Sequence, residues 1–259
     1  MKLLTRLLRE LLANIYRLAR VTMQKSPQPI LSRGDYKTVW DNMARTYDDA
    51  RLFVTGPMDL AAYRASGEAD AQGFISGIPI VPTDCVLEIG CGTGRLGPKI
   101  AQHCAHWTGA DVSSNMLRYA RKTLQGRTNV SFHELNGRDL DGIPTGSMDV
   151  VYCAVVFMHL DEWDRYRYVT EMWRVLKPGG RAYYNNFNLL GEEGWAVFLD
   201  HCAIDPLLRP PAFSKSSTSE ELRVYAERAG FTDIRTSAST KWIEVFAKKP
   251  TRTAAAGAA

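Results

Sequence analysis

Val86-Leu-Glu-Ile-Gly-Cys-Gly-Thr-Gly94 is the stretch around which the 259-residue chain is organised. Its apolar start, Val86 to Ile89, predicts a short buried strand, and its glycines predict a tight turn that lets a ligand approach the backbone. A helix is expected next, with Leu96, Ile100 and Ala101 on one face. A strand, a glycine-rich turn and a helix in this order are typical of the start of a nucleotide-type α/β site.

The spacing of the glycines narrows the kind of ligand. A dinucleotide fingerprint needs a glycine at the sixth position from Gly90, where this chain has Arg95, and the Gly-Lys-Ser/Thr of a phosphate-binding loop is absent. What remains is Glu88, two residues before Gly90-x-Gly92-x-Gly94. This arrangement resembles motif I of the class I S-adenosylmethionine-dependent methyltransferases. The alternative is a chance glycine turn in another α/β protein.

Other stretches fall in register with the same family: Asp111, Asp149 and Leu176–Gly180. The resemblance covers residues 36 to 249. It implies an α/β, doubly wound, Rossmann-like seven-stranded sheet, the class I methyltransferase fold, with additional N-terminal helices. Strands are expected at 86–89, 106–111, 130–134, within 147–160, at 182–186, 231–236 and 241–247, and helices at 36–50, 59–74, 161–175 and 218–230.

The chain is expected to divide into four parts. Residues 1–25 form a basic amphipathic helix, residues 26–82 a linker and lid helices, residues 83–249 the cofactor-binding core, and residues 250–259 a disordered tail. Within the core, residues 187–215 show little periodicity and several prolines, so we expect an insertion on the substrate side.

The first 25 residues concentrate positive charge. Six are basic and one is acidic, which gives a net charge of +5 and leaves about −1 for the rest of the chain. Their leucines recur at helical spacing, but charges interrupt them too often for a membrane span. Residues 1–21 could lie on an anionic membrane surface, or their leucine face could dock on the core or on a second copy. We therefore expect a cytoplasmic protein, peripheral at the membrane if the first reading holds, or a homodimer if the last does.

Two further classes of partner are disfavoured. A near-neutral body argues against a broad nucleic-acid footprint. The five cysteines are scattered and form no Cys-x-x-Cys pair, which indicates reduced thiols rather than a disulfide frame or a metal site. Neither nucleic acid nor metal is expected as a ligand.

The resemblance implies S-adenosyl-L-methionine as the cofactor. Asp111 would take the ribose hydroxyls, because the end of the second strand lies beside the first glycine turn. Its alternative role is to cap the next helix, although Ser113 and Ser114 can do so. Asn136 stands where the family usually has an aspartate against the adenine. The candidate cofactor-binding residues are Glu88, Gly90, Gly92, Gly94, Asp111, Val112, Met116, Asn136, Gly137, Cys153 and, from the lid helix, Tyr47.

His159 is the candidate catalytic residue, since it follows the fourth strand where acceptor and cofactor would meet. A neutral imidazole can take a proton from a hydroxyl at cellular pH. The alternative is a structural histidine at the junction between strand and helix.

The expected reaction is transfer of a methyl group to a small-molecule, lipid or sugar acceptor, on oxygen. The Asn-Pro-Pro-Tyr segment typical of amino-group methyltransferases for DNA bases and glutamine is absent after the fourth strand. Two alternatives stay open. One is a cofactor-binding, membrane-tethered protein without turnover, and the other is an aminopropyltransferase, which shares the core.

Overall fold

The computed structural model describes residues 35–209 and 212–251. The predicted N-terminal helix, the predicted linker up to residue 34 and the predicted tail beyond residue 251 lie outside the described residues. Among the helices in these two ranges, none combines the length and the apolar character that crossing a membrane requires.

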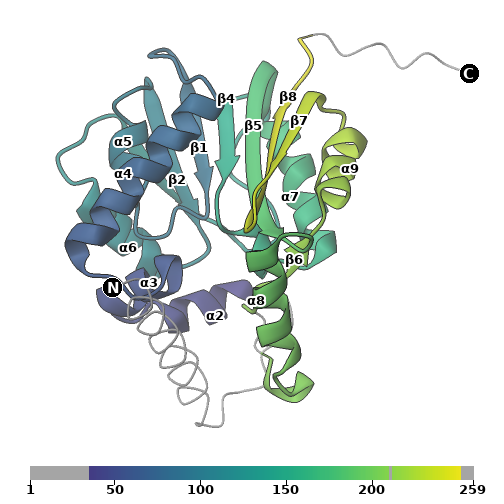
Figure 1. Cartoon of the computed structure of the whole chain (residues 1–259). Coiled ribbons are helices and arrows are strands. Elements are labelled where there is room, and N and C mark those ends of the chain that lie inside the picture. Colours follow the sequence, from purple (N-terminus) through teal and green to yellow (C-terminus); the bar gives the residue numbers. More distant parts are fainter. Residues whose placement is uncertain (1–34, 210–211, 252–259) are drawn as a thin grey trace, which may run out of the picture. The chain divides into compact units, whose positions relative to one another are not determined.

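An eight-stranded sheet forms the centre of the fold, and seven of its strands lie in the order β3-β2-β1-β4-β5-β8-β7 (Figure 1). Strands β1 to β5 pair in parallel, whereas β8 runs antiparallel to both β5 and β7. This confirms the predicted doubly wound sheet, with a two-residue strand, β6, added beside β5. The strands are β1 Cys85–Ile89, β2 His106–Asp111, β3 Val130–Glu134, β4 Met148–Cys153, β5 Leu176–Asn188, β6 Ser216–Ser217, β7 Thr232–Ala238 and β8 Trp242–Lys248.

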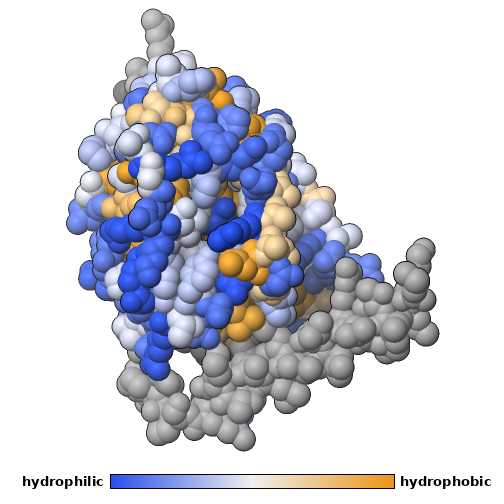
Figure 2. All heavy atoms as spheres, turned by 90° about the vertical axis from the view of Figure 1, so that its left-hand side faces the viewer, coloured by the Kyte–Doolittle hydropathy of each residue, from blue (hydrophilic) through white to orange (hydrophobic). Residues whose placement is uncertain are grey.

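Helices cover both faces of the sheet because successive strand residues point to opposite sides. Leu87 and Val151 pack in a cluster with residues of α7 and α9, whereas Val86 and Val150 pack in a second cluster with residues of α4, α5 and α6. The helices are α2 Tyr36–Met43, α3 Tyr47–Thr55, α4 Leu60–Gly77, α5 Gly97–Ile100, α6 Ser114–Thr123, α7 Glu162–Val175, α8 Glu192–Cys202 and α9 Ser219–Ala229, with single 3₁₀ turns at Phe157–His159 (η1) and Pro206–Leu208 (η2). The view onto the side of α5 and α6 is mostly hydrophilic, with small apolar areas between the polar ones (Figure 2).

The single helix predicted for residues 36–50 is wrong, because the structure has two. Thr46 adopts an extended backbone, and its hydroxyl accepts the N–H of Asp49, so a second helix begins at Tyr47. A threonine that can cap a new helix competes with continuation of the preceding one. The periodic spacing of Val39, Met43 and Tyr47 conceals this break.

The structure also differs from the sequence prediction in one additional helix and in the start of the fifth strand. Residues 187–215 contain an eleven-residue helix, α8, which their irregular pattern did not predict. The fifth strand begins at Leu176 rather than Ala182, because Leu176 pairs with Met148 and the backbone of Gly179 and Gly180 bonds to Lys249. By contrast, the predicted cap at Thr218 is confirmed: its hydroxyl accepts the N–H of Glu221.

Candidate functional site

A cavity lies at the carboxyl ends of the central parallel strands. Strand order reverses at β1, which has β2 on one side and β4 on the other, and such a switch point is where open α/β sheets bind ligands. The cavity contains about 920 Å³ of empty space, part of it open to solvent, and is lined by residues of α2, α3, the turn after β1, the ends of β2 and β3, the segment after β4, η1 and α7.

The glycine-rich turn after β1 forms the floor. Gly90, Gly92 and Gly94 have φ of 72°, 54° and 77°, which L side chains rarely adopt. A Cβ at Gly90 would lie 2.2 Å from Cγ2 of Val156, so the turn also needs a glycine for close packing. Gly90 and Gly92 line the cavity. Gly94 instead faces α6, where a Cβ would lie 2.7 Å from Leu124.

Asp111 closes the turn from the end of β2. Its carboxylate accepts the N–H of Gly92 at 2.8 Å and the N–H of Ser113 at 2.9 Å. The residue lines the cavity and is buried, and burial raises its pKa to about 6. Capping of α6 belongs to Ser113, whose hydroxyl accepts the N–H of Met116. The alternative role of Asp111 as the helix cap therefore has no support.

Glu88 is the second buried acid of the cavity, at the end of β1. Tyr152 on β4 donates its hydroxyl proton to Glu88 and accepts the indole N–H of Trp107 at 3.1 Å. Burial raises the pKa of Glu88 to about 8, against the opposing effect of the Tyr152 hydrogen bond. Tyr152 and Trp107 were not singled out from the sequence, because an aromatic residue on a buried strand is usually core.

Helices α2 and α3 form one wall, which Tyr36, Trp40, Phe53 and Val54 line. The Tyr36 hydroxyl donates to Asp164 at 2.8 Å and accepts the N–H of Asp161, both at the start of α7. At the other end of α2, the Asp41 carboxylate accepts hydrogen bonds from the start of α6. The first helix of the predicted lid thus joins the two sides of the cavity.

Arg95, just after the turn, and Arg51 on α3 carry buried donors that have no partner among the described residues. Arg95 lines the cavity and pairs with Asp70 at 2.6 Å, but its Nε has no hydrogen-bond partner among the described residues. Arg51 on α3 lies over the ring of Tyr63, and its Nε and Nη1 are likewise unpartnered within that part of the chain. Tyr63 in turn shares a 2.6 Å hydrogen bond with Thr93 of the glycine turn. Buried donors without a partner are costly, and of these two arginines Arg95 is the one that lines the cavity.

His159, the last residue of η1, lines the cavity and is buried. Its Nδ1 lies 2.8 Å from the carbonyl oxygen of Ala212. A carbonyl only accepts, so Nδ1 carries a proton in this contact. The edge of Trp40 packs against the ring at a centroid distance of 4.8 Å.

The structure gathers most, but not all, of the candidate residues. Val112 and Met116 line the cavity with the residues above, whereas Tyr47, Asn136, Gly137 and Cys153 are not among its lining. Tyr47 packs on Tyr119 instead, at 5.4 Å between ring centroids. Leu135 and Ala154, neighbours of Asn136 and Cys153, reach the cavity in their place.

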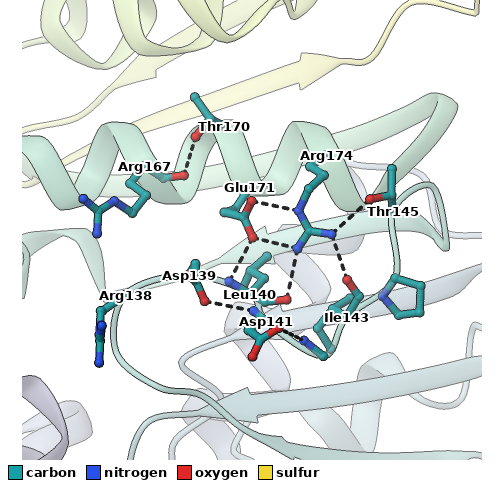
Figure 3. A network of polar contacts seen from close by, with 12 residues as sticks. Arg138, Asp139, Leu140, Asp141, Ile143, Thr145, Arg167, Thr170, Glu171 and Arg174 are labelled. Carbon is teal, nitrogen blue, oxygen red and sulfur yellow. Dashed lines mark hydrogen bonds and ion pairs between the residues drawn. The ribbon is translucent and has the colours of Figure 1, made fainter.

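Residues 138–145 form a loop that is bonded to α7 through Glu171 and Arg174 (Figure 3), and Asn136 lies just before this loop in the sequence. The side-chain oxygen of Asn136, which was expected to accept from an adenine amine, accepts the backbone N–H groups of Arg138 and Asp139 in this structure. Farther along the loop, Arg174 donates to the carbonyls of Leu140 and Ile143. Contact of Asn136 with a cofactor stays a prediction.

Known proteins resemble both the sequence and the structure. Residues 86–180 match a family model described as "Methyltransferase domain". A ubiquinone biosynthesis O-methyltransferase of Aromatoleum aromaticum is 31% identical over 104 residues, which are 40% of this chain and 44% of that protein. The chain thus spans less than half of the length of this curated relative.

Solved structures extend the likeness to the fold. The magnesium protoporphyrin IX methyltransferase of Synechocystis, solved with bound SAH, superimposes with a TM-score of 0.60 at 16% identity over 83% of this chain and 100% of that one. The phosphoethanolamine N-methyltransferase 2 of Haemonchus contortus, solved with S-adenosylhomocysteine, has a TM-score of 0.63 at 16% identity, over 85% of this chain and 61% of that one. At such identities the likeness concerns the fold alone.

Proposed function

We propose that the protein is an S-adenosylmethionine-dependent methyltransferase acting on oxygen of a small acceptor, because residues 86–180 match a methyltransferase-domain model and the chain has the class I methyltransferase fold. The observation that carries the proposal is the meeting, in one cavity, of the Asp111 carboxylate, the turn at Gly92 and the Arg95 side chain.

The residues of the cavity fit each part of the proposed cofactor. The Asp111 carboxylate would accept hydrogen bonds from a ribose diol. Val112, Met116 and Leu135 supply an apolar surface suited to an adenine ring. Arg95, with Arg51 nearby, offers donors to the carboxylate of the amino-acid end.

Bound S-adenosylmethionine would supply a methyl group already activated by its sulfonium charge. The residues of the chain then need to exclude water, align the acceptor and remove its proton. Trp40, Phe53 and Val156 give the wall near His159 an apolar character. The Nδ1 hydrogen bond to Ala212 holds the imidazole with its basic nitrogen on Nε2, which suits removal of a hydroxyl proton.

The acceptor is proposed to be a small molecule with an apolar body and a hydroxyl group. Apart from tyrosines and the Cys91 thiol, the ionisable side chains that line this cavity are His159, the buried acids Glu88 and Asp111, and Arg95, and the rest of the lining is largely aromatic and aliphatic. The relative named as a ubiquinone biosynthesis O-methyltransferase supports oxygen as the methylated atom.

The aminopropyltransferase alternative has less support. Such an enzyme needs acids that reach its substrate cavity, but Glu162 at the start of α7 is exposed and does not line the cavity, and two neighbouring acids are engaged elsewhere. Asp161 pairs with Lys215 at 2.7 Å, and Asp164 accepts the Tyr36 hydroxyl. Neither acid lines the cavity.

Incubation with methyl-labelled S-adenosylmethionine and a panel of phenols, sugars and carboxylic acids tests the proposal. We expect label in a low-mass product that survives mild alkali, as a methyl ether does and a methyl ester does not. Calorimetric binding of the cofactor without label transfer to any acceptor would favour the non-catalytic alternative. Consumption of decarboxylated S-adenosylmethionine with a polyamine would favour the aminopropyltransferase.

Cofactor affinity should depend on pH through Asp111. Its pKa is raised from 3.8 to about 6, and the ionised form is the one that accepts from a diol. Calorimetry should therefore show affinity falling roughly tenfold from pH 6.5 to pH 5, as the ionised fraction falls. Glu88, with a pKa of about 8, stays protonated across this window. A flat profile in the wild-type chain would contradict the role of Asp111.

The raised pKa of Asp111 affects folding stability in the opposite direction to cofactor affinity as pH rises. A carboxyl group whose pKa is higher in the folded state stabilises that state at low pH, so the stability it contributes is lost as pH rises through about 6. The contribution of Asp111 should therefore lower the melting temperature of the ligand-free protein between pH 5 and pH 7. With cofactor bound, the ionised carboxylate is stabilised, so the same contribution should raise the melting temperature over this range.

A further inference from the structure

The backbone of the cavity wall after β4 holds an unfavourable conformation. Val155 has φ of +62°, and Asp233 is the other non-glycine residue with positive φ in the part of the chain that the structure describes. Asp233 lies in an exposed strand, whereas Val155 lines the cavity. For a β-branched side chain this conformation is strained, and such strain persists only where surrounding contacts enforce it.

One side chain enforces it directly. The Oδ1 of Asn185, on β5, accepts the backbone N–H of Val155 at 2.7 Å. Asn185 is 7% exposed, and Tyr183, two residues before it on β5, donates its hydroxyl to Glu244 at 2.9 Å. Glu244 is the partner of Asn185 across the β5–β8 ladder, so the hydrogen-bonded pair of Tyr183 and Glu244 lies next to Asn185 in the sheet.

The strained residue sets the position of two parts of the site. Val156, the next residue, places Cγ2 where a Cβ at Gly90 would stand, so it closes on the glycine turn. The carbonyl of Val156 also accepts the N–H of His159 at 2.8 Å. A change of the Val155 backbone would therefore move both the wall over the turn and the start of the His159 segment.

We propose that Asn185 is a positioning residue, which holds Val155 in its left-handed conformation and thereby fixes Val156 against the glycine turn and His159 at the cavity. The inference rests on the proposed methyltransferase function. It concerns a residue of β5 that contacts the site through the backbone N–H of Val155.

A double-mutant cycle between Asn185→Ala and Val155→Gly tests the proposal. Glycine adopts positive φ without a steric penalty, so the hold by Asn185 matters less when residue 155 is glycine. We expect Asn185→Ala to lower kcat about 10- to 100-fold when Val155 is present, in line with the cost of small misplacements, and less than about threefold in the Val155→Gly background. The loss in melting temperature should shrink in the same way.

Asn186→Ala is the matched control. Asn186 is buried on the same strand and hydrogen-bonds Ser217 on β6. Its replacement should lower the melting temperature by the same amount with either residue at position 155. Equal losses of kcat from Asn185→Ala in both backgrounds would overturn the positioning role. A wild-type chain without methyl transfer would instead refute the proposed function itself.

Discussion

Replacement of His159 by asparagine is expected to lower kcat by roughly 10² to 10⁴, the usual contribution of a general base, while cofactor affinity stays near that of the wild type. Asparagine is chosen because its amide NH₂ can occupy the place of Nδ1 and donate to the Ala212 carbonyl. The substitution thus keeps the structural hydrogen bond and removes the basic Nε2. Single-turnover rates with an identified acceptor and calorimetry with S-adenosylmethionine measure the two quantities.

The comparison with His159→Ala separates the two roles of the side chain. If His159 has a structural role, the His159→Ala variant should have a lower melting temperature, and the His159→Asn variant should keep most of the wild-type turnover. His133→Gln is the control, since His133 bonds the carbonyl of Asp141 outside the cavity. Turnover of His159→Asn within about threefold of wild type would rule out the base role.

The sequence predicted those parts of the site that depend on local geometry. A strand followed by closely spaced glycines can turn in few ways, so the nine residues from Val86 to Gly94 were enough to predict that Glu88, Gly90 and Gly92 lie close together at the end of the strand. Asp111 was predictable because parallel strands joined by a helix end at the same edge of the sheet. The structure brings these residues to one cavity, as expected.

The residues that were missed act across long sequence separations. In the sequence, Arg95 is informative only because it breaks a dinucleotide pattern. Its backbone packs closely on α4, where a Cβ at Gly67 would lie 2.6 Å from the Arg95 carbonyl oxygen. The hold of Asn185 on Val155 joins two strands through one side chain. Hydrophobic periodicity does not predict such a hydrogen bond, because it indicates which face of an element is buried and not which polar groups are bonded to each other.

Replacement of Asp111 by alanine should weaken S-adenosylmethionine binding at least tenfold, because removal of a buried carboxylate that accepts two ligand hydrogen bonds costs on the order of 2 to 4 kcal/mol. The structure adds a second reason. The carboxylate already accepts the N–H groups of Gly92 and Ser113, so its loss also leaves two buried donors without a partner. A lower melting temperature is therefore expected in the same variant.

A ribose-modified ligand separates the direct contact from the loosened turn. The 2′-deoxy analogue of S-adenosylhomocysteine lacks one of the hydroxyls that Asp111 would accept from. Wild-type protein should bind it at least about tenfold more weakly than S-adenosylhomocysteine, as the loss of a hydrogen bond to a charged group predicts. Asp111→Asn, which keeps the shape of the side chain, should show a smaller difference between the two ligands. Equal discrimination by the wild type and this variant would mean that Asp111 supports the glycine turn alone and that another group holds the ribose.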